Sequence, residues 1–315
     1  MKILVTGGAG FIGNHLVDRL IKDGNKVIVL DNLDTSKFSN KDAEFFSGSI
    51  LNEDLVADLI KRVDSVVHLA ALVGVFNIVK HSLKGLQTNV LGSEIVIRNC
   101  AIRDKPLLLT SSSEIYGKNE SDELDELSDR IIGVPQRNRW SYSDSKAIEE
   151  AFAIAYHKEH KLPVKIVRLF NTVGPGQSGE YGMVLPRLFN SALANRDVEI
   201  YGTGKQTRCF MHVEDAVAGI NKFLTTEKFD GEIFNLGNPE EISIYELAVK
   251  IINITKSFSK ITYKNQQEIY GENFEDMGRR IPNINKAIDL LGWYPKISLD
   301  EILLDIKDYE MNKSG

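Results

Sequence analysis

The sequence predicts an α/β protein: a parallel, doubly wound sheet followed by a smaller lobe that mixes helices with short strands. Three observations predict this fold class. The first residues follow the order strand, glycine-rich turn, helix. Segments rich in Val, Ile and Leu then alternate with helical stretches up to about residue 170, which is the pattern of βαβ units. After Pro175 this alternation gives way to helices and one short strand.

The N-terminal segment KILVTGGAGFIG has the form of a dinucleotide-binding turn of the Rossmann type. We expect a strand at residues 2–6 and a helix from Phe11 to Lys22. Glycines in such a turn allow a tight bend and a close approach of the backbone to a pyrophosphate, while the start of the helix offers amides to the anion. The glycines of the turn are Gly7, Gly10 and Gly13, and Gly8, Gly10 and Gly13 satisfy the same spacing.

The second expected strand, KVIVL, ends at Asp31, which lies 18 residues after Gly13. A carboxylate at this place can accept hydrogen bonds from both ribose hydroxyls and would repel a 2′-phosphate. Because Asn32 rather than an arginine follows, the sequence favours NAD over NADP. The alternative is an aspartate that only terminates the strand.

The later elements of the first domain follow in order. Strands are expected at residues 45–50, 65–70, 106–111 and 164–170, and helices at residues 82–102 and 142–160. Ligands of such a sheet bind outside the carboxyl ends of the strands, and Ser112 and Glu114 lie at one of these ends. We expect the acidic stretch 119–129 to be a solvated loop.

The second half of the chain is expected to contain a loop, five helices and two strands. These are a loop at 176–182, helices at 184–195, 212–224, 245–254, 284–291 and 299–309, a strand at 198–202, and a strand at 233–237 that returns to the first sheet. The last three helices are expected in the smaller lobe. We therefore divide the chain into a Rossmann domain, 1–170 with a returning segment near 208–237, and a lobe, 171–315.

Tyr142 and Lys146 are the sharpest candidates for chemistry. Tyr142 opens a run whose apolar residues recur at helical spacing, so the tyrosine and the lysine share one face of a helix. Tyr201 and Tyr309 also precede a lysine by four residues, but one lies in a glycine-broken turn and the other near the C-terminal end. A phenol has a pKa near ~10 and an ammonium favours its ionised form, so we expect Lys146 to make Tyr142 a usable base. The alternative is a buried aromatic beside a solvated lysine.

The serine run before this helix adds a hydroxyl to the expected site. Ser112 can hold the substrate oxygen or the phenol oxygen while a proton moves. For Ser111 we expect only a strand-end turn in which the side chain caps its own backbone. A hydroxyl, the Glu114 carboxylate, a tyrosine and a lysine together suit removal of a proton from an alcohol while hydride leaves to a nicotinamide.

With these residues the chain resembles the extended short-chain dehydrogenase/reductase family of NAD-dependent nucleotide-sugar epimerases, dehydratases and decarboxylases. The resemblance covers essentially all 315 residues, because the motifs occur in the family's order: TGGAGFIG, Asp31, HLAA at 68–71, Asn89, SSSEIYG, Tyr142 with Lys146, RLFNTVGP at 168–175, YGTGKQTRCF at 201–210 and RRIP at 279–282. SSSEIYG, NRW before the tyrosine, GKQTRCF and RRIPNI are most similar to the UDP-glucuronate decarboxylase subgroup. Ser49 departs from the pattern, since many relatives place an aspartate there towards adenine.

The resemblance implies a set of site residues. The implied cofactor contacts are Gly7, Gly10, Phe11, Ile12, Gly13, Asp31, Asn32, Leu69, Ala70, Ala71, Asn89, Tyr142 and Lys146. The implied catalytic residues are Ser112, Ser113, Glu114, Tyr142, Lys146 and Arg280, and the implied substrate contacts are Asn171, Arg208 and Arg280. The planar fork of arginine suits phosphate oxygens. Arg279, Lys205 and Arg187 could equally be surface charges.

The family's shared step is oxidation of carbon 4 of a nucleotide-linked hexose to a ketone, and three outcomes remain open. A carboxylate at carbon 6 can leave as carbon dioxide, the ketone can be reduced on its other face, or water can be eliminated. Dehydratases usually place an aspartate where this chain has Ser113, and many 4-epimerases lack Glu114. Decarboxylation is therefore preferred, then 4-epimerisation, then dehydration, and a non-catalytic NAD-binding protein is the last alternative.

Composition excludes several other classes of protein. A net charge of −6 with interspersed signs argues against nucleic acid as a partner, and no apolar run approaches the ~18 residues of a membrane span. Cys100 and Cys209 are spaced for neither a disulfide framework nor zinc, and the six histidines show no ligand spacing, so we expect no metal and a cytoplasmic location. His68 is expected to line the cofactor cleft by its backbone.

The resemblance also implies a homodimer, formed through the helices near 82–102 and 143–160. Ala147, Ala151 and Ala155 form a stripe of small residues that permits close approach of a second chain. The alternative is that this stripe faces the chain's own sheet.

Overall fold

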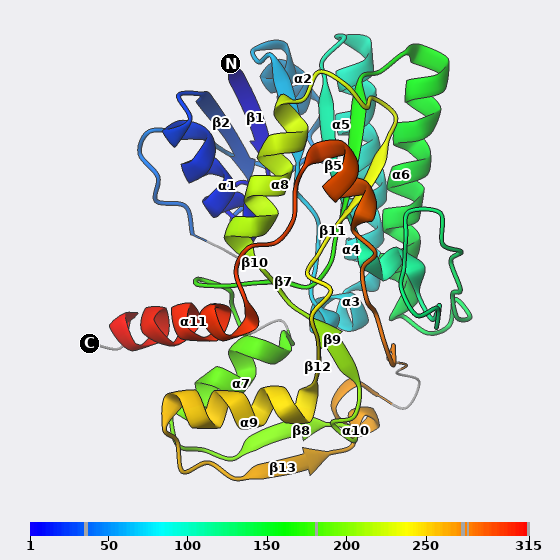
Figure 1. Cartoon of the computed structure of the whole chain (residues 1–315). Coiled ribbons are helices and arrows are strands. Elements are labelled where there is room, and N and C mark those ends of the chain that lie inside the picture. The colour runs from blue at the N-terminus through cyan, green and yellow to red at the C-terminus, as the bar shows by residue number, and fades with distance from the viewer. Residues whose placement is uncertain (35–36, 180–181, 272–274, 276, 314–315) are drawn as a thin grey trace.

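The centre of the molecule is a seven-stranded, fully parallel sheet (Figure 1). The structure is a computed structural model, and it describes residues 1–34, 37–179, 182–271, 275 and 277–313. The strands, in their order across the sheet, are β11 (Ile233–Leu236), β6 (Val164–Leu169), β5 (Leu107–Ser112), β4 (Ser65–His68), β1 (Lys2–Thr6), β2 (Lys26–Asp31) and β3 (Glu44–Ser47). The predicted doubly wound sheet and the return of 233–237 to it are confirmed. Strand order reverses at β1, which is where such sheets bind ligands.

Alternation along each strand explains why both faces of the sheet are covered. In β1, Ile3 and Val5 point into one core, while Leu4 points into the core on the other face. The first core is covered by α1 (Phe11–Lys22) and α8 (Val213–Thr225), and the second by α2 (Glu53–Lys61), α5 (Ser93–Ile102) and α6 (Trp140–His160). A sheet buried on both faces needs continuous apolar strands, and this is what the sequence shows.

The helix expected at 82–102 is helical throughout but irregular in its middle. It consists of α4 (Ser82–Leu86), a π-helical segment η1 (Gln87–Gly92) and α5, and it follows a short separate helix, α3 (Val75–Lys80). The π-helical segment contains Asn89, a predicted site residue. Helix α6 begins two residues before the predicted start, at Trp140.

The smaller lobe has its own core, which confirms the mixed α/β character predicted for it. That core is built from α7 (Val184–Leu193), β8 (Val198–Tyr201), α9 (Ile244–Thr255) and α11 (Leu299–Lys313), and β8 pairs with β13 (Ile261–Lys264). Two strand pairs, β9 (Thr207–Cys209) with β12 (Glu241–Ser243) and β7 (Thr172–Val173) with β10 (Met211–His212), and the short α10 (Gln266–Tyr270) complete the second half. Of the loop expected at 176–182, residues 180–181 lie outside the described residues.

One expectation for the second half and one for the acidic loop are corrected. Segment 284–291, expected in the lobe, packs on the Rossmann core instead, because Ile284 and Leu291 join the cluster formed with α1 and α8. The last part of it is π-helical, η3 (Ala287–Leu291). The acidic stretch 119–129 is not simply solvated, because Leu124 is buried and exchanges backbone hydrogen bonds with residues 281 and 283.

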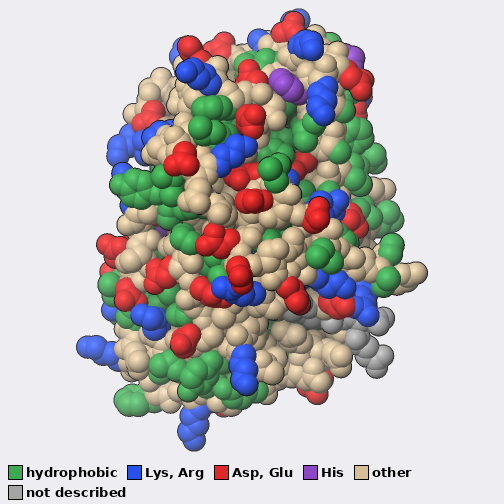
Figure 2. All heavy atoms as spheres, turned by 45° about the vertical axis from the view of Figure 1, so that its right-hand side comes forward, with side chains coloured by type: hydrophobic (Ala, Val, Ile, Leu, Met, Phe, Trp, Pro, Cys, Tyr) green, Lys and Arg blue, Asp and Glu red, His purple; other side chains and the backbone are tan. Residues whose placement is uncertain are grey.

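The surface agrees with a mixed distribution of charge. On the face seen in Figure 2, Lys and Arg side chains are interspersed with Asp and Glu. Among the described helices, none has both the length and the apolar character needed to cross a membrane.

Candidate active site

The glycine turn between β1 and α1 has the shape that a dinucleotide requires. Gly7 has a φ of +71°, and a Cβ placed on it would lie 2.6 Å from the backbone nitrogen of Ala70. A Cβ on Gly13 would lie 2.2 Å from the carbonyl oxygen of Gly7. Helix α1 begins after Gly10, no side chain caps it, and its first turn has no acidic residue. The amides of that turn, which includes Phe11 and Ile12, therefore suit an anion.

Asp31 lies beside this turn, at the carboxyl end of β2. Its Oδ2 accepts a hydrogen bond from the backbone nitrogen of Ala9 at 3.1 Å, and its Oδ1 accepts one from Leu33 at 2.8 Å. Asn32 is exposed and accepts from the backbone nitrogen of Asp34. Ser49 accepts from the backbone of its own turn at Leu51.

The segment after β4 lies next to the same turn. The backbone nitrogen of Leu69 donates to the carbonyl of Thr6 at 3.0 Å, and that of Ala70 lies 3.4 Å from the Thr6 hydroxyl. Ala71 continues this segment and is half-buried. His68 is buried, and both its ring nitrogens are engaged by side chains, with Thr6 at 2.6 Å and Ser93 at 2.8 Å. The residues around the three strand ends therefore fit the dinucleotide that the sequence predicts.

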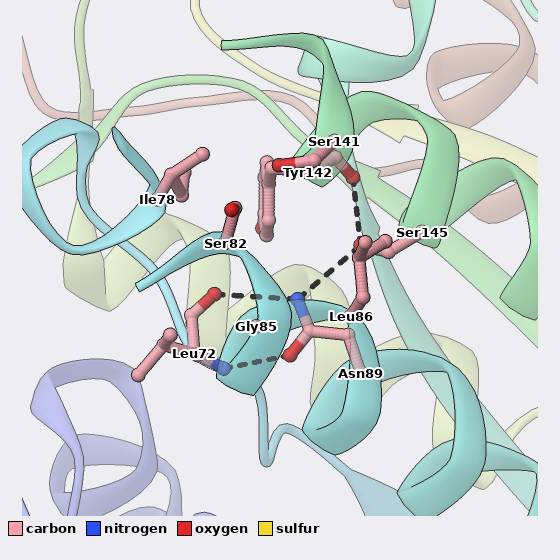
Figure 3. A pocket seen from close by; sticks show the side chains of 9 residues that line it. All are labelled: Leu72, Ile78, Ser82, Gly85, Leu86, Asn89, Ser141, Tyr142 and Ser145. Atoms are coloured by element: carbon pink, nitrogen blue, oxygen red, sulfur yellow. Dashed lines mark hydrogen bonds between the residues drawn. The ribbon is translucent and has the colours of Figure 1, made fainter. Parts of the chain in front are cut away.

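A small pocket lies between the α3–α4 region and the start of α6 (Figure 3). Tyr142 is one of its walls, and Asn89 lies at the opposite side. The Asn89 amide accepts from the backbone nitrogen of Leu72 at 2.7 Å and donates to the Ser145 hydroxyl at 3.2 Å. Asn89 thus ties the segment after β4 to the helix that carries Tyr142.

Lys146 lies four residues after Tyr142 on α6, is buried, and is held by two acceptors. Its Nζ donates to the carbonyl of Thr110 at 3.0 Å and to Oε2 of Glu149 at 2.9 Å. Lys146 is 3% exposed and Glu149 is fully buried. The sequence interpretation missed Glu149. Its spacing of three residues from Lys146 on the same helix face was the signal that could have found it.

The expected effect of Lys146 on Tyr142 is present but does not dominate. Burial raises the pKa of Tyr142 above its usual value, and the carboxylates of Glu149 and Glu114 raise it further. The Lys146 ammonium and the Ser112 hydroxyl lower the pKa of Tyr142, but by less. The net direction is therefore opposite to the one the sequence suggested, first because Tyr142 is buried and second because Glu149 and Glu114 oppose the lysine.

Ser112 ends β5 and caps the short 3₁₀ helix η2 (Ser113–Tyr116). Its Oγ accepts from the backbone nitrogen of Glu114 at 3.2 Å. The capping expected of Ser111 therefore belongs to Ser112, and the Ser111 hydroxyl is buried without a hydrogen-bond partner among the described residues. Strand β5 continues through Ser112, so Ser111 lies within the strand and not in the turn that follows it. Ser113 is buried as well.

Glu114 is held between two arginines. Its Oε1 lies 2.7 Å from Nη1 of Arg280, and its Oε2 lies 3.2 Å from Nη2 of Arg139. Burial raises the pKa of Glu114, but Arg139 and Arg280 lower it more strongly, to about 2. Glu114 is therefore ionised throughout the physiological range. Arg139 lies three residues before Tyr142, one helical turn away, and was not singled out from the sequence.

The predicted substrate residues, Asn171, Arg208 and Arg280, lie close to one another around Glu114. Nη2 of Arg280 donates to Oδ1 of Asn171 at 2.7 Å, so one arginine joins residues that are far apart in the chain. Arg208, on β9, donates to the carbonyl of Thr207 and is close enough to contribute to the low pKa of Glu114. Backbone hydrogen bonds between Leu124 and residues 281 and 283 hold the segment that carries Arg280 next to Glu114.

The three arginines and lysines that could be surface charges are separate from this cluster where the structure describes their contacts. Arg279 pairs at the surface with Glu241 and Asp122. Arg187 lies over the ring of Tyr201, with its guanidinium carbon 3.8 Å from the ring centre. Lys205 is exposed.

Comparison with known proteins gives one family and consistent relatives. The model of the NAD dependent epimerase/dehydratase family matches residues 3–237. A UDP-N-acetyl-alpha-D-glucosaminuronate decarboxylase of Bacillus cytotoxicus is 37% identical, over 95% of this chain and 94% of that protein. UDP-glucuronic acid decarboxylase 4 of Arabidopsis thaliana is 34% identical, over 100% of this chain and 70% of that protein.

Solved structures agree on the fold. The UDP-glucose 4-epimerase of Thermotoga maritima, solved with UDP-glucose, superposes with a TM-score of 0.92 at 29% identity and covers 100% of both chains. The UDP-glucuronic acid 4-epimerase of Bacillus cereus, solved with UDP-glucuronic acid and NAD, has a TM-score of 0.87 at 27% identity, over 99% of this chain and 100% of that one.

Proposed function

Because this chain belongs to the NAD-dependent epimerase/dehydratase family, we propose that it decarboxylates a UDP-linked hexuronate. It is an NAD-dependent enzyme, and the two relatives described above are named as decarboxylases. The observation that carries the proposal is the charge around Glu114. Arg139 and Arg280 both pair with the Glu114 carboxylate, and Arg208 lies close enough to help lower its pKa, so three guanidinium groups of the kind that binds carboxylates converge here.

The chain's residues divide the work as follows. Tyr142 accepts the proton of the sugar's 4-hydroxyl, and Ser112 holds that oxygen. Bound NAD supplies the hydride acceptor for carbon 4, and the glycine turn and Asp31 would hold it. Lys146 supports the ionised form of Tyr142, as its lowering effect on the Tyr142 pKa indicates.

The ketone at carbon 4 makes the carboxylate at carbon 6 a β-keto acid, whose carbon–carbon bond breaks to release carbon dioxide. The bonding electrons pass into the ketone as an enolate, and carbon 5 then takes a proton. Arg280 and Arg139 hold the carboxylate end of the substrate or the oxygens that gain charge. Glu114 is ionised, so it can orient water or accept a proton but brings none of its own. Tyr142 finally returns a proton to the oxygen at carbon 4, while carbon 4 would take back the hydride from the reduced cofactor, so that the alcohol is restored and the oxidation is reversed.

A second candidate is 4-epimerisation, because two of the superposed structures are 4-epimerases with UDP-sugars bound. It shares the first step and differs only in the fate of the ketone. Dehydration is less favoured, because this chain has Ser113 at the position where dehydratases usually have an aspartate.

A panel of UDP-hexoses and UDP-hexuronates, including UDP-glucuronate and its 2-acetamido counterpart, separates these functions by mass spectrometry and NMR. Loss of carbon dioxide identifies the decarboxylase. An unchanged mass with altered ring couplings identifies the epimerase, and loss of water the dehydratase. Bound NAD without turnover of any substrate would leave a non-catalytic member of the family.

We also propose a homodimer, because the helices that would form its interface have apolar side chains exposed to solvent. Ala151 and Ala155 are exposed, so this part of the small-residue stripe does not face the chain's own sheet. Leu91 on η1 and Ile148 on α6 are 55% and 41% exposed on neighbouring helices. We propose that a second copy covers this surface, so that a pair of helices from each chain packs against the pair from the other.

A cytoplasmic location is proposed as well, since both cysteines are free thiols.

A further inference from the structure

Glu149 is a buried carboxyl group with no role so far in the proposed reaction, and burial raises its pKa against the lowering effects of Lys146 and Ser93. Its side chain is fully buried, and its Oε2 lies 2.9 Å from Nζ of Lys146. A carboxylate is seldom buried without a partner, because loss of its hydration is unfavourable. Glu150, the next residue, has a separate structural partner in Arg168, with both carboxylate oxygens bonded at 2.9 and 2.8 Å.

The contacts of Lys146 limit what it can do for Tyr142. An ammonium has three donors. One donates to the Thr110 carbonyl and one to Glu149, which leaves one for the site. The position of Lys146 is thus fixed from β5 and from its own helix.

Among the charged groups near Lys146, Glu149 is the one that acts on it most strongly. Burial and the Lys146 ammonium lower the pKa of His68, on β4, to about 3, so this histidine is neutral. From α5 the Ser93 hydroxyl faces Glu149, and from α6 Glu150 and Tyr142 lie near. Glu114 acts on Tyr142 from η2.

We propose that Glu149 is a positioning residue for proton transfer at Tyr142, which anchors the Lys146 ammonium and offsets part of the charge that Tyr142 experiences. The proposal rests on the proposed function only in taking Tyr142 as the proton acceptor. Tyr142 must first accept a proton and later return it to the same oxygen. A tyrosine made too acidic would fail in the return, so a buried carboxylate behind the lysine balances the two steps.

The test is Glu149→Gln, which keeps the size of the side chain and an oxygen acceptor but removes the charge. The pKa of Tyr142 is read by carbon-13 NMR of ring-labelled tyrosine, with Tyr142→Phe identifying its signal. We expect this pKa to fall by about one unit in Glu149→Gln, and the acid limb of kcat/KM to move to lower pH by the same amount. KM should stay near that of the wild type. Glu159→Gln, an exposed carboxylate on the same helix, is the matched control and should shift neither.

Glu149→Asp keeps the charge but shortens the reach to Lys146, and it decides the matter if Glu149→Gln does not fold. It should lower kcat at least severalfold with little change in KM and with an acid limb near that of the wild type. A Tyr142 pKa that is unchanged or raised in a folded Glu149→Gln, or full kcat in Glu149→Asp, overturns the proposal. If the wild type converts no UDP-hexuronate, the proposed function fails, yet the NMR titration still tests Glu149.

Discussion

Substitution of Glu114 by glutamine gives the most quantitative prediction. Glu114 is 17% exposed and pairs with Arg139 and Arg280. Its pKa is lowered from about 4.5 to about 2. A shift of roughly 2.5 units at ~1.36 kcal/mol per unit corresponds to about 3 kcal/mol of stability from the ionised form. Glutamine keeps the shape but removes the charge, so Glu114→Gln should lower the free energy of unfolding by up to about 3 kcal/mol.

The pH dependence of this loss follows from the direction of the shift. A carboxylate whose pKa is depressed in the folded state stabilises the protein fully above its unfolded pKa, near 4.5, and progressively less as the pH falls towards 2. The difference in stability between wild type and Glu114→Gln should therefore be constant from pH 5 to 7 and shrink below about 4.5.

The assay is urea unfolding of both proteins at several pH values, with Glu120→Gln, an exposed carboxylate of the nearby acidic loop, as control. On the best substrate, the variant should also accumulate a 4-keto sugar, because Ser112, Tyr142 and Lys146 remain able to oxidise carbon 4. Equal stability of wild type and variant at pH 7 would refute the electrostatic reasoning. A stable variant as fast as wild type would remove Glu114 from the mechanism and favour a simple 4-epimerase.

Three further predictions concern the base, the cofactor and the assembly. Tyr142→Phe should lower kcat by ~10²- to 10⁴-fold while NAD binding, followed by calorimetry, is retained; near wild-type turnover would contradict its role. Asp31→Ala should weaken NAD and improve the relative binding of NADP, since it removes the ribose acceptor and the repulsion of the 2′-phosphate; equal binding of both cofactors by the wild type would show that the carboxylate is not used this way. Ile148→Asp should convert a dimer into a monomer in light scattering at micromolar concentration, and a wild type that is already monomeric would reject the proposed interface.

Local patterns in the sequence were enough for the sheet and for half of the site. The apolar runs of β1 and β2 and the glycines between β1 and α1 predict their own structure, because period and turn chemistry act over a few residues. Helical spacing likewise predicted that Tyr142 and Lys146 share a face. The capping role expected of Ser111 belongs to Ser112, because the strand runs one residue further than its composition suggested.

The remaining parts of the site depend on contacts between distant residues. Arg280 and Glu114 are 166 positions apart, and the pairing of residues 281–283 with Leu124 holds the segment of Arg280 near Glu114. For the same reason the packing of segment 284–291 on the Rossmann core could not be predicted from its local pattern. Glu149 was within reach of helical spacing, but its burial, and so its effect on Tyr142, depends on how α6 packs on the sheet.

Release of carbon dioxide is the most direct test of the central claim. UDP-glucuronate and its 2-acetamido counterpart, each labelled with carbon-13 at carbon 6, are incubated with the purified enzyme and NAD and followed by NMR. We predict that the label appears as bicarbonate while a UDP-pentose forms, and that Arg280→Ala abolishes this release. A label that stays on the sugar while the ring couplings change to those of the 4-epimer would contradict decarboxylation.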